Sequence, residues 1–233
     1  MLILFDIDGT ILLTKSAGVH AMRDAGRELF GEHFTIDGCE FSGRLDSLIW
    51  NDLTRINNVE NSQAEHDRFR TTYGRHLTHR LTTNPTAMLL PGVKDLVHEL
   101  VDVDHATVGL LTGNYPETGR LKIQQAGLDP DLFRVAAWGI DGQSRRSLPP
   151  VAMKRHEQLT GRVLRGEKVI IIGDTPHDID CAKANGCRSI GVATGAFTLD
   201  DLQTSGADLA VETLADTQAM MRWMLQSNAP VSK

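Results

Sequence analysis

Cysteine is scarce in this chain of 233 residues, which contains three: Cys39, Cys181 and Cys187. Their number is odd, and none of them has the CxxC or cysteine–histidine spacing of a metal site. These features argue against a disulfide framework and against a zinc site. Unpaired cysteines persist in reducing compartments, so we expect a cytoplasmic location.

Long hydrophobic runs are also missing. Runs such as Met1–Phe5 and Val169–Ile172 are far shorter than the ~20 residues that a membrane span requires. Met1–Phe5 has no basic leader and is followed at once by Asp6, so we expect no signal peptide. The sequence therefore predicts no membrane partner.

Clusters of basic residues are absent as well. The chain has 24 Lys and Arg against 30 Asp and Glu, which gives a formal net charge of −6. A nucleic-acid-binding surface concentrates positive charge, so this balance argues against a nucleic-acid partner.

What the chain does contain is an alternation of short β-rich runs with longer helical stretches, which is typical of an α/β fold with a parallel sheet. The run Lys168–Ile172 is almost entirely apolar and β-branched after its first residue, so it predicts a central strand that is buried on both faces. The expected strands are Leu2–Phe5, Thr107–Leu111, Arg134–Ala137, Lys168–Ile172, Ser189–Val192 and a weaker run, Leu209–Val211.

The first two expected strands are unusually far apart. About one hundred residues separate Phe5 from Thr107, many more than one crossover helix needs. The interval is polar, and its apolar residues recur at helical spacing. One such stripe consists of Val19, Met22, Ala25 and Leu29. The sequence therefore predicts a helical insertion over 14–88 in an α/β core that comprises 1–13 and 89–233.

Acidic residues follow two of the expected strands directly. Asp6-Ile7-Asp8-Gly9-Thr10 comes after the first strand, and Gly173-Asp174-Thr175-Pro176-His177-Asp178 comes after Lys168–Ile172. Strand alternation sends Asp6 and Asp8 to the same side, where their like charges favour a cation between them. The acids could instead belong to ordinary turns, and Asp178 could simply cap the helix that begins near it.

Ligands of an open parallel sheet bind beyond the C-terminal ends of its strands, where Asp6, Asp8 and Asp174 all lie. Hard carboxylate oxygens together with a substrate phosphate suit Mg²⁺, so we expect a magnesium site that also holds a phosphate. A third strand end carries Thr112-Gly113-Asn114. Its hydroxyl and its backbone N–H groups are suitable phosphate donors, although a small polar turn would have the same composition.

Together these residues resemble the haloacid dehalogenase-like hydrolase superfamily, and within it the phosphoglycolate phosphatase-like branch. The resemblance rests on Asp6-x-Asp8-Gly9-Thr10, Thr112-Gly113-Asn114 and Gly173-Asp174-x-x-x-Asp178, and it spans the whole chain. It implies a Rossmann-like sheet of order 5-4-1-2-3 flanked by helices, with the strands of Asp6 and Asp174 adjacent. The insertion resembles the helical cap domain of that family.

The resemblance also implies catalytic roles. Asp6 would be the nucleophile that becomes an aspartyl phosphate. Asp8 would be the general acid for the leaving oxygen and then the base for the attacking water. Mg²⁺ would be held by an Asp6 oxygen, by the backbone carbonyl of Asp8 and by Asp174.

Further residues would contact the phosphate. Thr112 would bind the transferring phosphoryl group, assisted by the turns that contain Gly9, Gly113 and Asn114. Asp178 would lie next to the metal ligands without binding the ion itself. In the insertion, Arg44 could bind an anionic group of the substrate, or it could pair with Asp46 inside the cap.

One departure from the family pattern concerns the cation that usually stands in a Lys-Pro pair before the last motif. No Lys-Pro occurs in this chain, and the corresponding segment contains Arg145 and Arg146 before Pro149. We favour Arg145, because a guanidinium binds phosphate oxygens with several donors. Arg146 and Lys154 are the alternatives.

The second acid, Asp8, favours phosphoryl transfer, because dehalogenating members of the family lack an Asp at that position. We therefore expect a magnesium-dependent phosphatase that acts on a small phosphorylated metabolite. The alternatives are a phosphomutase of the same family and a binding protein that has lost turnover. The sequence leaves open whether the protein is a monomer or a dimer.

Overall fold

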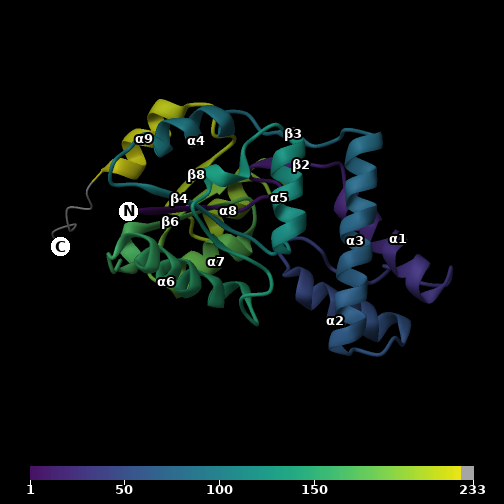
Figure 1. Cartoon of the computed structure of the whole chain (residues 1–233). Coiled ribbons are helices and arrows are strands. Elements are labelled where there is room, and N and C mark those ends of the chain that lie inside the picture. The colour runs from purple at the N-terminus through teal and green to yellow at the C-terminus, as the bar shows by residue number, and fades with distance from the viewer. Residues whose placement is uncertain (227–233) are drawn as a thin grey trace.

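The computed structural model describes residues 1–226 of the chain as an α/β core with a helical insertion beside it (Figure 1). The core contains a six-stranded sheet of order β5-β4-β1-β6-β7-β8, in which every neighbouring pair is parallel. Its strands are β1 (Leu2–Phe5), β4 (Thr107–Leu111), β5 (Val135–Ala137), β6 (Val169–Gly173), β7 (Arg188–Val192) and β8 (Leu209–Val211).

This order confirms the predicted fold class. When the six strands of the core sheet are numbered in chain order, the sheet reads 6-5-4-1-2-3 from the β8 edge. This is the expected 5-4-1-2-3 arrangement, extended by β8 as a sixth strand. The strands of the two acidic motifs, β1 and β6, are direct neighbours, with Phe5 opposite Ile172.

Alternating side chains of β1 belong to two separate apolar clusters, one on each face of the sheet. Ile3 and Phe5 of β1 belong to the cluster covered by α4 and α9, whereas Leu2 and Leu4 belong to the cluster covered by α6 and α7. Figure 1 shows these helix pairs on opposite sides of the sheet. The helices of the core are α4 (Val93–Val101), α5 (Pro116–Gln125), α6 (Leu148–Thr160), α7 (Pro176–Ala184), α8 (Leu199–Thr204) and α9 (Thr217–Leu225), with short 3₁₀ turns η1 (Pro130–Leu132), η2 (Arg145–Ser147) and η3 (Gly166–Lys168).

The insertion forms a helical cap. It consists of α1 (Ala17–Phe30), α2 (Asp46–Asn57) and α3 (Gln63–Thr83), which share a third apolar cluster. The two chain segments that join cap and core run side by side, because β2 (Leu12–Leu13) pairs antiparallel with β3 (Met88–Leu89). The division at residues 14 and 88 itself stays a prediction.

The core and the cap contact each other through α3 and α5, which lie next to each other at the boundary (Figure 1). Among residues 1–226, no helix has both the length and the apolar composition that crossing a membrane requires.

Two cap glycines offer a matched test of packing. A Cβ added at Gly26 on α1 would lie 2.1 Å from the buried ring of Phe34, whereas a Cβ added at Gly74 on α3 would meet nothing within 4 Å. We expect Gly26→Ala to lower the free energy of unfolding by about 1–3 kcal/mol. Gly74→Ala should raise it by about 0.5–1 kcal/mol through helix propensity. Urea unfolding of both variants checks this, and equal stabilities would contradict the packing at Phe34.

Candidate active site

The acids of the two motifs meet at the C-terminal ends of β1 and β6. Asp6 continues the ladder of β1, since its N–H donates to the carbonyl of Ile172 at 2.9 Å. One carboxylate oxygen from each of Asp6, Asp174 and Asp178 lies within 4.8 Å of the others. Asp6 and Asp174 are each 5% exposed, and Asp178 is fully buried. Three negative charges are therefore gathered where water solvates them poorly.

The crowding of these carboxylates shows in their proton affinities. Burial raises the pKa of Asp174 to about 8, and the neighbouring charges of Asp6 and Asp178 act in the same direction. Burial also raises the pKa of Asp6 to about 6, against the lowering effect of Arg145. Positive charge at this position would favour the ionised forms of both groups.

Arg145 supplies one such charge. It lies in η2, its side chain is 7% exposed, and its Nη2 atom lies 3.1 Å from Asp6 Oδ2. The other candidates lie elsewhere: Arg146 pairs with Asp180 on the surface, and Lys154 is exposed on α6. Of the three cations considered for this role, Arg145 is the one that lies among the acids.

Asp178 holds both Arg145 and the start of α7. Its Oδ1 accepts from Arg145 Nε at 2.9 Å and from Nη2 at 2.5 Å. Its Oδ2 accepts from the backbone N–H of Thr175 at 3.1 Å and from the Thr175 hydroxyl at 2.7 Å. Asp178 is thus a helix-capping residue, the simpler of the two interpretations of the sequence, and at the same time the main partner of Arg145.

The donor set fits a magnesium ion. Both oxygens of Asp178 already accept hydrogen bonds, which leaves Asp6 and Asp174 as the carboxylates available to a cation. Mg²⁺ is commonly held by one or two carboxylates and completes its shell with water and substrate phosphate. The Asp8 carboxylate is not part of this cluster, so a contribution from Asp8 would come through its backbone carbonyl.

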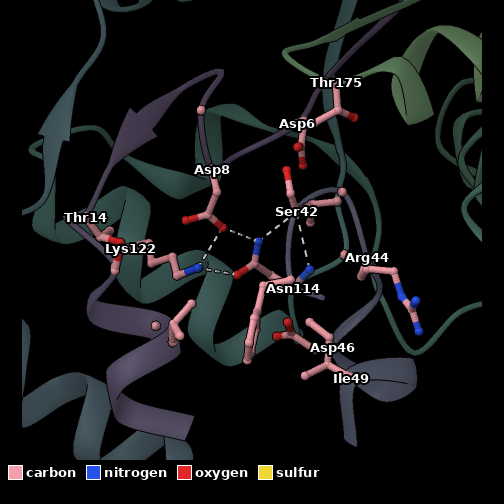
Figure 2. Close-up of a pocket in the computed structure, with 18 of the residues that line it drawn as sticks. Asp6, Asp8, Thr14, Ser42, Arg44, Asp46, Ile49, Asn114, Lys122 and Thr175 are labelled. Atoms are coloured by element: carbon pink, nitrogen blue, oxygen red, sulfur yellow. Dashed lines mark hydrogen bonds and ion pairs between the residues drawn. The ribbon is translucent and has the colours of Figure 1, made fainter. Parts of the chain in front are cut away.

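The Asp8 side chain belongs to a second set of contacts (Figure 2). Its Oδ2 accepts from Lys122 Nζ at 2.6 Å and from Asn114 Nδ2 at 2.9 Å. Asn114 Nδ2 also donates to the Thr112 hydroxyl at 2.8 Å, and Asn114 Oδ1 accepts from Lys122 at 2.7 Å. A direct contact of Asn114 and Thr112 with phosphate stays a prediction, and the amide of Asn114 is already engaged with Asp8.

Two of the predicted glycines lie where a side chain would not fit. Gly9 has a φ of +80°, and a Cβ there would be 2.3 Å from Asp174 Oδ2. A Cβ at Gly113 would be 2.0 Å from the backbone oxygen of Arg44 in the cap. The first glycine lets the turn after Asp8 pass close to Asp174, and the second lets the cap lie against the Thr112 turn.

Cap and core enclose a cavity of about 420 Å³ between them. The core contributes Asp6, Asp8, Lys122 and Asp174 to its lining. The cap contributes the apolar side chains Val19, Met22, Phe41 and Ile49, and also polar ones that include Lys15, Ser42, Arg44 and Asp46. A molecule held there would contact the acids with one end and the cap with the other.

Asp46, at the start of α2, ties the cap to the core. Its N–H donates to the carbonyl of Gly113 at 2.7 Å, and its Oδ2 accepts from the N–H of Tyr115 at 3.1 Å. Burial raises the pKa of Asp46 to about 7, although the charge of Lys122 opposes this.

Arg44 does not pair with Asp46, which corrects one of the two readings of this segment. Its guanidinium pairs with Asp52 at 2.5 Å and with Glu40 at 3.7 Å, because Asp46 is turned toward the core instead. In Figure 2 the Arg44 guanidinium extends away from Asp8. A role for Arg44 in binding the substrate stays a prediction.

Lys122 and Asp46 are the pocket residues that sequence reasoning missed. Lys122 lies on α5, the helix that directly follows the Thr112 motif, and belongs to no motif itself. The sequence indicates Asp46 only as a partner of Arg44. An acidic residue in the first turn of a helix indicates helix capping. The carboxyl of Asp46 instead accepts from the backbone N–H of Tyr115, which lies 69 residues away in the chain.

The family model described as haloacid dehalogenase-like hydrolase matches residues 3–192. The chain belongs to this family. No curated protein matches the sequence of this hydrolase significantly.

Solved structures share the fold of this haloacid dehalogenase-like hydrolase at low sequence identity. CbbY from Rhodobacter sphaeroides in complex with phosphate is 16% identical, with a TM-score of 0.71 over 92% of this chain and 95% of that one. A predicted phosphoglycolate phosphatase from Haemophilus somnus is 18% identical, with a TM-score of 0.68 over 94% and 97%. The β-phosphoglucomutase of Clostridium difficile is 16% identical, with a TM-score of 0.69 over 95% of each chain. At these identities the likeness concerns the fold.

The metal site predicts a thermal shift. In about 10 mM Mg²⁺ we expect the Tm to rise by about 3–8 °C, because the ion binds the folded chain alone. Asp174→Asn should abolish most of this shift, whereas the exposed Asp200→Asn should retain it. Thermal unfolding with Mg²⁺ and with EDTA measures the effect, and an undiminished shift in Asp174→Asn would exclude this residue as a ligand.

Asp46 predicts a pH dependence of stability. Its pKa is about 7 in the folded chain and about 4 when unfolded, so the folded state holds an extra proton between these values. The contribution of Asp46 to stability therefore falls as pH rises through that window. We expect the unfolding free energy of Asp46→Asn, relative to the parent, to rise by about 1–3 kcal/mol from pH 5 to pH 8.

Urea unfolding in EDTA at the two pH values measures this difference. The exposed Asp104→Asn serves as the control and should show no such change. A difference that is the same at both pH values for Asp46→Asn would mean that the buried carboxyl titrates normally.

Proposed function

We propose that this hydrolase is a magnesium-dependent phosphatase that acts on a small phosphorylated metabolite through a phosphorylated aspartate. One observation carries the proposal: two acids that are neighbours in sequence have different surroundings. Asp6 is buried beside Arg145 and the carboxylate of Asp174, whereas the Asp8 side chain is 45% exposed and contacts Lys122. A nucleophile and a proton donor that act in one reaction need such a difference.

Asp6 is the nucleophile in this proposal. A bond forms between an Asp6 carboxylate oxygen and phosphorus, and the bond from phosphorus to the leaving oxygen breaks with its electron pair. Arg145 is the positive charge nearest to Asp6, with Nη2 3.1 Å from Oδ2, and it compensates the charge of the phosphoryl group and of the nucleophile. Arg145 can supply the cation that a Lys-Pro pair provides in the family pattern. This argues against the alternative of a binding protein that has lost turnover.

Asp8 moves the protons. It gives a proton to the leaving oxygen in the first step. In the second step water attacks phosphorus, its proton passes to Asp8, the bond to Asp6 breaks, and inorganic phosphate is released. Asp8 thereby returns to its starting protonation state after each turnover.

Asp6, Asp174 and the backbone carbonyl of Asp8 are the groups that would hold Mg²⁺. When bound, the ion neutralises charge, so that a carboxylate and an anionic phosphate can approach each other. The closeness of the carboxylate oxygens of Asp6 and Asp174, in a place almost without solvent, supports this assignment.

The size of the cavity supports a small substrate. A volume of about 420 Å³ accommodates a metabolite, and the cap that covers one side of it reduces the access of bulk water. The cap side of the lining combines apolar side chains such as Met22 and Phe41 with polar ones such as Lys15 and Ser42, which suits a leaving group with both a carbon portion and polar groups.

A phosphomutase of the same family remains the second candidate. The observation in its favour is the structural likeness to the β-phosphoglucomutase of Clostridium difficile, which has a TM-score of 0.69. A phosphatase releases one inorganic phosphate for each ester consumed, whereas a mutase returns the phosphoryl group to a sugar. Phosphate release from p-nitrophenyl phosphate and from a panel of sugar phosphates distinguishes the two.

The same assay tests the catalytic roles. With Mg²⁺, we expect the parent to hydrolyse p-nitrophenyl phosphate and Asp6→Asn to lose at least ~10³-fold in kcat, because an amide oxygen is a poor nucleophile. The exposed Asp104→Asn should keep parental activity. Turnover retained in Asp6→Asn would remove the covalent route, and a parent without phosphate release on any ester would overturn the proposed function.

A further inference from the structure

Lys122 is a buried ammonium group that no motif of the sequence predicted. It projects from α5 into the boundary with the cap, and its side chain is 6% exposed. A lysine near a surface can extend its stem so that its charge reaches water. Here the charge is withdrawn from water, which is costly unless nearby groups compensate it. The compensating groups are Asp8 Oδ2 at 2.6 Å and Asn114 Oδ1 at 2.7 Å.

The contacts of Lys122 fix the orientation of Asn114. An ammonium group can only donate, so the atom of Asn114 that faces it must be the carbonyl oxygen. The amide nitrogen then faces Asp8 Oδ2 at 2.9 Å and the Thr112 hydroxyl at 2.8 Å, which uses both of its hydrogens. Lys122, Asn114 and Thr112 are thus linked by hydrogen bonds to one another and to Asp8. Figure 2 shows the contacts among Lys122, Asn114 and Asp8.

The two oxygens of Asp8 are consequently unequal. Oδ2 accepts from both Lys122 and Asn114. A proton placed on Oδ2 would face two donors, so the protonated form of Asp8 carries its proton on Oδ1. The acid that serves the leaving oxygen therefore has a defined reactive atom and a fixed plane.

We propose that Lys122 is a positioning residue for Asp8: together with Asn114 it holds Oδ2, so that Oδ1 exchanges the proton with the leaving oxygen and then with water. This inference rests on the proposed phosphatase function. In the first step Oδ1–H gives its proton to the oxygen that leaves phosphorus, and in the second step Oδ1 takes a proton from the attacking water.

Two other ionisable groups face Lys122 from the cap. The first is Asp46 on α2: burial raises its pKa, and the positive charge of Lys122 opposes this effect. The second is the Tyr73 hydroxyl on α3. It lies near Lys122, since a Cβ added at Gly18 would be 3.3 Å from that hydroxyl and 3.4 Å from Lys122 Nζ. Lys122 could therefore serve only to join cap and core. That purely structural role would affect all substrates alike, whereas a role in proton transfer depends on the leaving group.

The test compares two phosphate esters of similar size. p-Nitrophenyl phosphate has a leaving group that departs without a proton, whereas the alkoxide of benzyl phosphate must be protonated as it departs. The quantity kcat/KM includes steps up to the first irreversible one, which here is the departure of the leaving group, so it reports the step in which Asp8 acts as an acid. In Lys122→Met we expect kcat/KM to fall about 10- to 100-fold for benzyl phosphate and less than ~3-fold for p-nitrophenyl phosphate.

Three further variants calibrate the comparison. Asp8→Asn should show the same selective loss, because it removes the acid itself. Lys122→Gln keeps a donor toward Asp8 without the charge, so its loss on benzyl phosphate should lie between those of the parent and Lys122→Met. The exposed Lys94→Met should leave the ratio of the two substrates unchanged. Circular dichroism checks folding, and Lys122→Gln carries the test if Lys122→Met does not fold.

The outcomes separate the inference from the function on which it rests. Equal losses on both esters in the Lys122 variants, in an active parent, would overturn the positioning role and leave the phosphatase proposal intact. A parent that releases phosphate neither from these two esters nor from the panel of sugar phosphates would overturn both. Selective loss on benzyl phosphate in Lys122→Met, matched by Asp8→Asn, would support the proposal.

Discussion

The burial of negative charge at the ends of two adjacent strands is the constraint on which this site depends. Asp6, Asp174 and Asp178 lie close together and are almost completely shielded from water. Ionised groups in such surroundings persist when hydrogen bonds and opposite charges compensate them. Arg145 provides part of this compensation from η2, and Asp178 in turn holds Arg145 in place. Burial, together with the neighbouring carboxylates, raises the pKa values of Asp6 and Asp174 despite the charge of Arg145, and a divalent cation would compensate the remaining negative charge.

Asp6 and Asp8 are two residues apart in the chain, and each is paired with a different cationic side chain. Asp6 faces Arg145 of η2, whereas Asp8 faces Lys122 on α5. The turn at Gly9 follows Asp8 immediately, so the chain changes direction just after the second acid. Neighbouring positions in the sequence thus belong to different electrostatic environments, as an attacking group and a proton donor require.

Much of the core could be predicted because its signals are local. An apolar run followed by an acid marks both β1 and β6, and the strand positions agree with the predicted runs to within a residue. The adjacency of β1 and β6 came from the family resemblance, since the composition of a strand does not specify its neighbour. Arg145 could be favoured over Lys154 because a guanidinium binds phosphate oxygens with several donors. The pairings of Asp8 with Lys122 and of Asp46 with Tyr115 could not be predicted in this way, because each joins residues on elements far apart in the chain. The first depends on how α5 packs beside the turn after β1, and the second on how the cap lies against the core.

The seating of the cap and the orientation of Asp8 share one loop. The carbonyl of Gly113 accepts from the N–H of Asp46, and the N–H of Tyr115 donates to its carboxyl, so the cap holds this loop on both sides of Asn114. A Cβ at Gly139 would lie 2.0 Å from the carbonyl oxygen of Gly113, so the next loop of the core supports it closely from below. Asn114 therefore has little freedom to move while the cap is in place, and its amide keeps its contact with Asp8. The same backbone segment that lets the cap close over the cavity thus fixes the acid that the enclosed reaction needs.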